Sequence, residues 1–538
     1  MPISPERLQT AVDEMIELLI SGKVTTTREV EQTKRKVSRK HGLNATFRNS
    51  EILAMLPKDA PQHLRNILRR KAVRNISGIA VVAVMTAPAL CPGNCIYCPG
   101  GLHGDNPTPK SYTGLEPAAR RAAQNHFDGF SQTTARLSQL NAIGHDTTKV
   151  HLIVMGGTLL SQPHLYQEQF FKDCLDAVIG YRTASVEDSC REAENSQRRL
   201  VGITYETRPD FCRPEHVDRI LSLGGTWVEI GVQTLRDDIL QRIHRGHSLT
   251  DTIAAIQVAR DSGLKITLHM MPNLFASPEE DVQMFQELFS SPNFHPDALK
   301  IYPLLVLKGT PLYELWKKGD FSPYSENEVI KVLARVKMDI PPYVRIQRIQ
   351  RDIPANLIQD GVIHSNLREL VLEQLQIEGK RCRCIRCREI GHKIQKNSLA
   401  RADITDPKLQ MRRYSANEGE ELFLSYEDPK NDVIFGFLRL RIPSDRPHRP
   451  EISDIPSALV RELHVYGQAV GVGLTPDNRP EIWQHKGLGK KLLSCAEKMA
   501  TDDYGMKQLL ITSGIGVRAY YRKLGFSQLG VYMAKTLS

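Results

Sequence analysis

Three cysteines lie within eight positions of a chain that has only ten cysteines in 538 residues. They are Cys91, Cys95 and Cys98, in the stretch CPGNCIYCPGG. A disulfide uses two sulfurs and a zinc site usually takes four protein ligands, so three thiolates match neither. A 4Fe-4S cube on three thiolates would keep one iron free for a substrate. The spacing therefore favours a reactive iron–sulfur cluster; a zinc site completed by a distant histidine, or unpaired buried thiols, are the alternatives.

A second group, Cys382, Cys384 and Cys387 in RCRCIRCREIGH, has the spacing Cys-x-Cys-x-x-Cys. Three sulfurs at this spacing can surround one zinc ion, with His392 or His364 as the fourth ligand. A second cluster, or thiols without a metal, are the alternatives. Because no substrate position is evident here, we predict a structural zinc that contributes to folding.

Phosphate chemistry is indicated near the end of the chain. In QHKGLGKKLL, Gln484, Gly487 and Gly489 precede a predicted helix, and Lys490 adds positive charge. Uncovered N–H groups and the helix dipole favour a phosphate at such a position. A Gly-x-Gly pair alone is a weak signal, but here it follows a strand pattern and opens a helix.

The elements that position the first cysteine group are short apolar strands alternating with helical stretches. The predicted strands lie in KVHLIVMGGT, RLVGITYETRPD, TWVEIGVQT, LKITLHMMPNL and ALKIYPLLVL. Repeated βα units predict an α/β fold with a parallel sheet, curved into a whole or partial barrel. The loops at the carboxyl ends of such strands carry the chemistry. At that rim we predict a cofactor site formed by Gly156, Gly157, Glu206 and Gln233; ordinary capped strand ends are the alternative for each residue.

Positive charge is concentrated before the cysteine loop. Residues 34–80 contain twelve Lys or Arg and two acidic residues, so this stretch holds the whole formal excess of +10. Concentrated positive charge is typical of a nucleic-acid partner, although a solvated helical face is the alternative. The residues predicted to contact nucleic acid are Lys34, Arg35, Lys36, Arg39, Lys40, Arg69, Arg70 and Lys71.

Composition excludes several other classes. With 41% hydrophobic residues the chain can form roughly three or four globular units. Its longest apolar run, residues 78–90, is too short to span a bilayer and contains Pro88. We find no export signal, and clustered cysteines indicate metal ligands in a reducing compartment. We therefore expect a cytoplasmic protein without membrane association.

Several motifs carry a family resemblance. The Cys-x-x-x-Cys-x-x-Cys spacing with Tyr97 before the last cysteine resembles the radical S-adenosylmethionine (SAM) enzymes. The glycine-bearing turn and the closing SGIGVRAYYRKLGF resemble the GCN5-related acetyltransferases. Together with SYTGLEPAARRA, GITYETRPD and VRELHVYG, in this order, the chain resembles the catalytic subunit of Elongator in its stand-alone prokaryotic form.

This resemblance implies a fold and an activity. The expected fold is a partial radical SAM barrel of the TIM type (residues 76–360), a zinc-binding linker (361–400) and an acetyltransferase domain (401–538), behind a helical basic region (1–75). The implied activity adds a carboxymethyl group to the wobble uridine of tRNA, with acetyl-CoA as carbon source and a SAM-derived radical. A protein lysine acetyltransferase with the barrel as scaffold and a tRNA-binding module with a degenerate barrel are two alternatives. A third is methylthiolation of tRNA, which uses the same radical motif but gives no reason for the acetyl-CoA turn.

The resemblance also implies cofactors, partners and residue roles. It implies a 4Fe-4S cluster, SAM, acetyl-CoA and a reductant protein, with the anticodon stem-loop of tRNA as partner. Lys149 would contact acetyl-CoA from the radical domain, and the barrel and acetyltransferase sites would face a shared cavity. The residues implied to bind acetyl-CoA are Glu462, Leu463, His464, Val465, Leu488, Gly489 and Lys490, with Tyr520 and Tyr521 at the acyl end.

Overall fold

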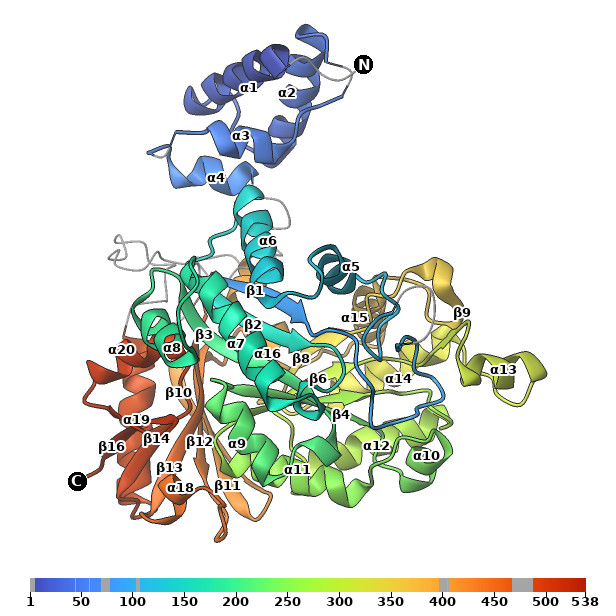
Figure 1. Cartoon of the computed structure of the whole chain (residues 1–538), viewed down its shortest axis with the longest axis vertical. Coiled ribbons are helices and arrows are strands. Elements are labelled where there is room, and N and C mark those ends of the chain that lie inside the picture. The colour runs from blue at the N-terminus through green and yellow to red at the C-terminus, as the bar shows by residue number, and fades with distance from the viewer. Residues whose placement is uncertain are drawn as a thin grey trace.

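A helical bundle stands apart at the start of the chain (Figure 1). The computed structural model describes residues 5–43, 45–57, 59–68, 78–102, 107–395, 404, 406–466 and 487–538. The bundle consists of α1 (Pro5–Ile20), α2 (Thr27–Lys40), α3 (Asn49–Met55) and α4 (Gln62–Leu68). Thr26 and Glu29 form a capping box that begins α2, and Val12, Val30 and Ile52 are buried in the bundle core. The predicted helical N-terminal region is confirmed.

A seven-stranded parallel sheet forms the centre of the molecule. Its strands, in spatial order, are β1 (Ile79–Met85), β2 (Lys149–Met155), β3 (Arg199–Thr207), β4 (Trp227–Gln233), β5 (Lys265–Met270), β6 (Ala298–Ile301) and β8 (Arg345–Ile349). Each strand pairs in parallel with the next, and β1 and β8 are the edges of the sheet. The predicted partial barrel is therefore confirmed, because the sheet is parallel throughout and open.

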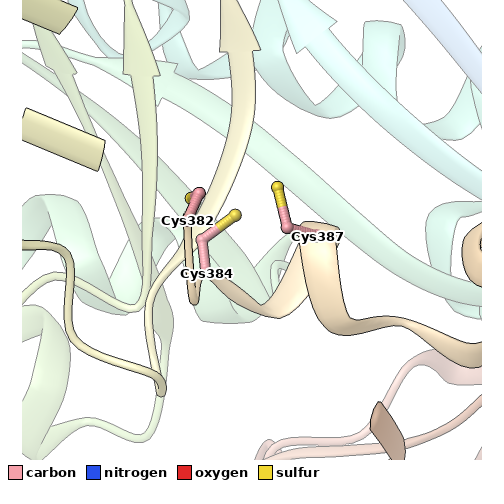
Figure 2. Close-up of side chains that lie close together, drawn as sticks. All are labelled: Cys382, Cys384 and Cys387. Carbon is pink, nitrogen blue, oxygen red and sulfur yellow. The ribbon is translucent and has the colours of Figure 1, made fainter. Parts of the chain in front are cut away.

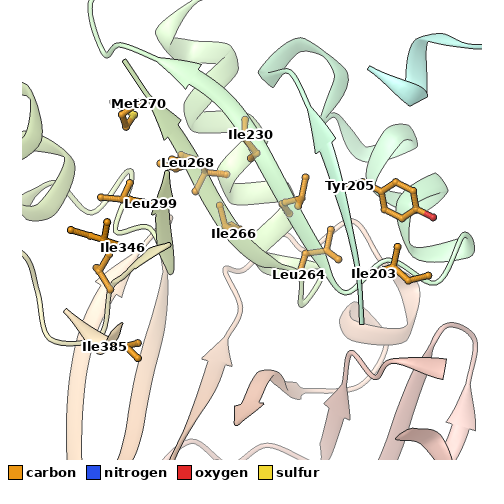
Figure 3. Close-up of a cluster of buried hydrophobic side chains, with 14 of the residues drawn as sticks. Ile203, Tyr205, Ile230, Leu264, Ile266, Leu268, Met270, Leu299, Ile346 and Ile385 are labelled. Atoms are coloured by element: carbon orange, nitrogen blue, oxygen red, sulfur yellow. The ribbon is translucent and has the colours of Figure 1, made fainter. Parts of the chain in front are cut away.

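Helices cover the outer face of this sheet. They are α6 (Gly129–Ala142), α7 (His164–Ile179), α8 (Val186–Asn195), α9 (Pro214–Ser222), α11 (Leu249–Asp261), α12 (Pro278–Ser290), α14 (Glu326–Asp339) and α15 (Leu367–Ile377). Three further helices pack near the carboxyl ends of the strands: α5 (Pro117–Gln124), α10 (Asp237–Arg242) and α13 (Pro311–Lys318). Apolar side chains such as Ile230, Ile266 and Leu268 form the core beneath the covering helices (Figure 3). Alternate residues point to the opposite face, so polar residues such as Glu229 line the inner side.

A short segment joins the barrel to the last domain. Strands β7 (Leu305–Leu307) and β9 (Ile358–Gly361) form an antiparallel pair, and the short helices α16 (Ile385–Arg388) and α17 (Ile390–Gln395) follow α15. The second cysteine group lies at the start of α16, where Ile385 N–H donates to the Val344 carbonyl at 3.0 Å. This contact attaches the linker to the edge strand of the barrel.

The C-terminal domain is a second seven-stranded sheet. Its spatial order is β10 (Lys408–Ala416), β11 (Gly419–Asp428), β12 (Val433–Ile442), β13 (Ser457–Val465), β14 (Gln508–Ile511), β16 (Tyr532–Thr536) and β15 (Ser527–Leu529), with α18 (Pro450–Ser453), α19 (Leu488–Asp502) and α20 (Arg518–Arg522). Only the β13–β14 pairing within this sheet is parallel. This pairing places α19 as the crossover between the two strands.

The two sheets meet at the amino ends of the barrel strands. Arg461 of β13 forms two hydrogen bonds with Asp297, which precedes β6, at 2.7 and 2.8 Å, and also pairs with Glu421. A Cβ on Gly514 would lie 2.3 Å from the Val201 carbonyl oxygen, so this loop packs directly on β3. Buried ion pairs and close backbone packing thus fix the C-terminal domain against the barrel.

No helix in the described part of the chain is long and apolar enough to cross a lipid bilayer.

Candidate functional site

The first cysteine group lies in the loop after β1, at the carboxyl end of the parallel sheet. The loop is fixed by backbone hydrogen bonds from Ile96 N–H to the Ile243 carbonyl (3.1 Å) and from Leu312 N–H to the Ile96 carbonyl (2.9 Å). Cys98 Sγ accepts a hydrogen bond from Ser111 N–H at 3.1 Å, and burial raises the pKa of this thiol. A bound metal would therefore be needed to favour its thiolate form.

The distances between sulfurs distinguish the two cysteine groups. Tetrahedral zinc with bonds of about 2.3 Å holds its sulfurs roughly 3.8 Å apart. In the described part of the chain, Cys382, Cys384 and Cys387 place their sulfurs within 4.8 Å of one another, whereas Cys91, Cys95 and Cys98 do not form such a group. The wider group suits a cube that binds each cysteine through a different iron, and the tighter group suits one ion.

The predicted cofactor rim follows three neighbouring strand ends. Gly156 and Gly157 directly follow β2 and have φ of 120° and 93°. A Cβ on Gly156 would lie 2.4 Å from Thr86 Oγ1, so only glycine fits there. Glu206, near the end of β3, accepts a hydrogen bond from Tyr112 at 2.8 Å, and Gln233 ends β4 with φ of 74°. These residues lie at the same edge of the sheet as the cysteine loop.

A polar cluster on the inner face was missed by the sequence analysis. Glu229 of β4, His269 of β5 and Lys300 of β6 converge, with His269 Nε2 3.2 Å from Glu229 and the Lys300 ammonium in direct contact with the same carboxylate. Burial opposes ionisation of Glu229, but the Lys300 ammonium and His269 outweigh it and hold its pKa at about 2. A polar residue at every second position of an otherwise apolar strand was the available signal.

The three side chains of the second cysteine group lie close together (Figure 2), with their sulfurs within 4.8 Å of one another. Neither histidine proposed as fourth ligand joins it in the structure: His364 Nδ1 lies 2.6 Å from Glu326, and His392 Nε2 lies 3.8 Å from Glu389. The fully buried Lys337 ammonium lies 3.9 Å from Cys387 Sγ. Three thiolates and a divalent ion carry one net negative charge, which this ammonium offsets.

The proposed acetyl-CoA strand diverges from its neighbour. β13 pairs with β14 only over Ser457–Val460, and a bulge at Arg461 interrupts its pairing with β12. The following residues of β13 therefore have β12 on one side and no paired strand on the other within the described chain. Such a gap between two diverging parallel strands can receive an extended ligand.

The amino end of α19 faces this gap. Gly487 precedes the helix with φ of 80°, and a Cβ on Gly489 would lie 3.6 Å from Tyr520 Oη, 3.8 Å from Val465 Cγ2 and 4.0 Å from Leu463 Cδ2. Leu488 is buried and Lys490 is exposed, whereas Gln484 lies outside the described residues. The predicted pyrophosphate turn and acetyl-CoA strand are thus adjacent.

The two tyrosines differ in their surroundings. Tyr520 is half-buried with its hydroxyl beside Gly489, whereas Tyr521 is buried in the domain core with its ring 5.9 Å from that of Phe526. Burial raises the pKa of both phenols. The structure therefore favours Tyr520, rather than Tyr521, as the tyrosine next to a bound ligand.

The other residues predicted to bind acetyl-CoA are Glu462, at the domain junction, and His464 and Lys149. Glu462 contacts the Lys265 ammonium and accepts a hydrogen bond from Arg439 at 3.0 Å. Burial lowers the pKa of His464 to about 4, so this imidazole is neutral at physiological pH. Lys149 is the half-buried first residue of β2, at the amino end of the sheet, and burial lowers its pKa.

The predicted nucleic-acid residues separate by exposure. Arg35, Lys36, Arg39 and Lys40 are exposed on α2, and Lys40 pairs with Glu14 at 2.9 Å. Lys34 is 5% exposed and donates to Asn49 Oδ1 at 2.7 Å, which indicates a role in packing. Three predicted residues lie outside the described part of the chain: Arg69, Arg70 and Lys71.

Family models match three consecutive parts of the chain. They are the ELP3 N-terminal domain (residues 8–76), the radical SAM superfamily (88–289) and the radical SAM C-terminal domain (296–376). The second match contains the cysteine loop and all four rim residues. Radical SAM proteins use a 4Fe-4S cluster and SAM, which agrees with the chemistry expected at the carboxyl end of the sheet.

Relatives match nearly the whole chain. The tRNA uridine(34) acetyltransferase of Methanocaldococcus jannaschii is 47% identical, with 98% of both chains covered. Elongator complex protein 3 of Schizosaccharomyces pombe is 44% identical over 94% of this chain and 93% of its own. The structure of Methanocaldococcus infernus Elp3 with an N-terminal deletion matches at a TM-score of 0.76 and 45% identity, covering 86% of this chain and all of that one. The chain therefore belongs to the Elongator complex protein 3 family, which includes the archaeal tRNA uridine(34) acetyltransferases.

Proposed function

We propose that this protein modifies uridine 34 of tRNA, adding a carboxymethyl group to carbon 5 with acetyl-CoA as the carbon source and SAM-derived radical chemistry. One observation carries the proposal. Glu462, on the proposed acetyl-CoA strand, contacts Lys265 at the start of β5. The other end of β5 pairs with Gln233 of the predicted cofactor rim. A six-residue strand is roughly 20 Å long. The two candidate sites thus lie at opposite ends of one half-barrel, so the acetyl group would have to pass along the inner face of the sheet to meet the radical. The shared cavity that the resemblance implies stays a prediction.

The residues at the carboxyl end fit the radical chemistry. Cys91, Cys95 and Cys98 would hold the cluster, with Gly156, Gly157, Glu206 and Gln233 around SAM. When bound, the cluster and SAM would supply radical chemistry at this end of the sheet, by which a hydrogen atom can be removed from a carbon such as the acetyl methyl group. The surrounding half-barrel would keep water and other hydrogen donors away from this end of the sheet.

The C-terminal domain would hold acetyl-CoA. The backbone of Leu463–Val465 would bind the extended pantetheine arm, as a strand added to β13. Gly487 and Gly489 leave the first N–H groups of α19 open to the pyrophosphate, and the helix dipole favours its charge. The Tyr520 hydroxyl would then lie near the thioester and donate a hydrogen bond there.

The tRNA substrate explains the basic helix and the exposed rim. Arg35, Lys36 and Arg39 on α2 would contact phosphates of the anticodon stem-loop and fix its position without reading sequence. The wobble base lies in a single-stranded loop, so it can leave its stack at small cost and enter the half-barrel. We place the protein in the cytoplasm, with a reductant protein supplying electrons and zinc held by the second cysteine group.

A direct test measures acetyl-CoA hydrolysis by the full-length, anaerobically reconstituted protein with and without tRNA. The wobble nucleoside is then analysed by mass spectrometry after incubation with SAM and a reductant. We expect hydrolysis that depends on tRNA and a mass gain of one carboxymethyl group on uridine. Hydrolysis that is independent of tRNA, with an unmodified nucleoside, would favour a protein acetyltransferase instead.

A further inference from the structure

Arg245 is a buried arginine directly behind the first cysteine loop. The residue is only 7% exposed and follows α10 in the chain. Arg245 Nη1 donates to Cys95 Sγ at 3.5 Å, and Nη2 donates to the Gly231 carbonyl at 2.7 Å. The guanidinium thus lies between a cysteine of the proposed cluster and the end of β4.

Within the described part of the chain, this guanidinium pairs with no carboxylate. Among the described residues, no carboxylate oxygen lies within 4.0 Å of Arg245, whereas the neighbouring Arg208 pairs with Asp210 at 2.9 and 3.0 Å. An isolated buried charge costs several kcal/mol, so buried arginines are normally paired. The group that Arg245 contacts instead is the Cys95 sulfur, which would carry negative charge as a ligand of the cluster.

The surrounding backbone is shaped to hold this side chain. A Cβ on Gly231 would lie 2.7 Å from Arg245 Nη2. A Cβ on Gly93, in the cysteine loop itself, would lie 3.0 Å from the Arg245 carbonyl oxygen and 2.0 Å from Arg208 Nη1. Arg208 Nη2 also donates to the Arg245 carbonyl at 2.8 Å. Two glycines and a paired arginine therefore keep Arg245 against the loop.

We propose that Arg245 is a positioning residue for the iron–sulfur cluster, which orients Cys95 and raises the reduction potential of the cluster. The inference rests on the proposed function, because it requires that Cys95 holds a cluster. Reduction adds one electron from a one-electron donor, without forming or breaking a bond, and makes the cluster more negative by one charge. A buried positive charge that donates a hydrogen bond to a ligand sulfur stabilises the reduced form more than the oxidised form.

The test compares Arg245→Gln and Arg245→Lys with wild type, each as full-length protein reconstituted anaerobically. Iron and sulfide are quantified, and the midpoint potential is measured by titration with dithionite, followed by electron paramagnetic resonance. We expect Arg245→Gln to hold a cluster with a more negative potential, and Arg245→Lys to lie between it and wild type because it keeps the charge but not the planar fork. Arg236→Gln, at a half-buried arginine that pairs with Asp238 and Glu280, is the control and should keep the wild-type potential.

Equal potentials in wild type and cluster-loaded Arg245→Gln would overturn the inference. If Arg245→Gln fails to bind iron, the comparison uses Arg245→Lys instead. A midpoint potential of Arg245→Lys equal to that of wild type would then count against a role of Arg245 in setting the cluster potential. The proposed function itself would fail if the wild-type protein held no cluster, or held one but did not cleave SAM when reduced. The potential needs neither tRNA nor acetyl-CoA, so the two failures are distinguishable.

Discussion

Lys265 and Glu462 form a buried ion pair across the boundary between the barrel and the C-terminal domain. The Lys265 ammonium also lies 3.5 Å from the centroid of the Trp227 ring, and Glu462 accepts a second hydrogen bond from Arg439. Burial lowers the pKa of Lys265 to about 8, although Glu462 opposes this shift. The start of a barrel strand is thus tied directly to the proposed acetyl-CoA strand.

Breaking this pair from one side should destabilise the protein more than removing both charges. Glu462→Gln leaves the Lys265 ammonium buried without a carboxylate, at an expected cost of about 3 kcal/mol. The double variant Lys265→Met with Glu462→Gln removes the stranded charge and should recover part of this loss. Thermal unfolding of wild type, both single variants and the double variant gives the coupling. Losses that simply add would show that the two residues are independent.

The two cysteine groups should bind different metals. Cys95→Ser should lower iron content and the visible absorbance of the cluster but leave zinc near one ion per chain. Cys384→Ser should lose the zinc and lower the melting temperature, because a structural metal contributes to folding. Elemental analysis of each purified variant tests this assignment. Loss of iron from Cys384→Ser, with zinc retained, would reverse it.

The sequence predicted the features that depend on local residue patterns, namely most strands of the barrel and the residues at their ends. Short apolar runs alternating with helical stretches identified β2 to β6, although not the edge strands β1 and β8. The positions of Gly156, Glu206 and Gln233 followed because all parallel strands end at one edge. The contacts between distant segments could not be read in this way. Arg245 and Cys95 are 150 positions apart, and Lys34 has the same charge as its exposed neighbours but faces Asn49. Whether a charged residue such as Lys34 is exposed or buried depends on which side of its helix packs against other elements, and tertiary packing determines that side.

The two adjacent tyrosines should differ in function. Tyr520→Phe removes the hydroxyl beside Gly489, and we expect tRNA-dependent acetyl-CoA hydrolysis to fall at least about tenfold. Tyr521→Phe keeps the ring that packs on Phe526, so hydrolysis should stay within about twofold of wild type. Initial rates at saturating tRNA, with cluster absorbance as a check on folding, compare the two variants. The opposite ranking would restore Tyr521 as the residue at the acyl end.

Asp281 should make stability depend on pH. Burial raises its pKa from 3.8 to about 6, against the hydrogen bonds that it accepts from Asn273 N–H (2.6 Å) and Tyr324 (2.8 Å). A folded-state pKa above the unfolded value contributes stability that is present below about pH 4 and lost as pH rises through 6. Asp281→Asn stays neutral and can accept both hydrogen bonds through its amide oxygen. Its advantage over wild type should therefore grow between pH 4 and 7, by up to about 3 kcal/mol.

Thermal midpoints of both proteins across this pH range measure the effect. Asp297 offers a contrasting buried carboxyl, since the Arg461 and Arg439 guanidinium groups outweigh burial and hold its pKa well below the usual value. Asp297→Asn should accordingly be destabilising throughout the range. A difference between Asp281→Asn and wild type that does not change with pH would place the Asp281 pKa near that of an ordinary carboxyl.

Exposed arginine and lysine residues on α2 should determine the affinity for tRNA. The triple variant Arg35→Ala, Lys36→Ala and Arg39→Ala removes three exposed charges without touching the bundle core. Each lost phosphate contact should reduce the slope of log K against log salt by about 0.7 to 0.9. Binding of an anticodon stem-loop, measured by fluorescence anisotropy at several salt concentrations, tests this expectation.

A matched control separates specific contacts from net charge. Lys308, Lys317 and Lys318 are exposed residues at and near α13, on the barrel rather than the helical bundle. Replacing these three by alanine changes the net charge by the same amount, but should alter the salt slope much less. Nonspecific attraction depends on total charge, whereas counterion release depends on actual phosphate contacts. An equal reduction of the salt slope in the two triple variants would therefore contradict the assignment of α2 as the tRNA surface.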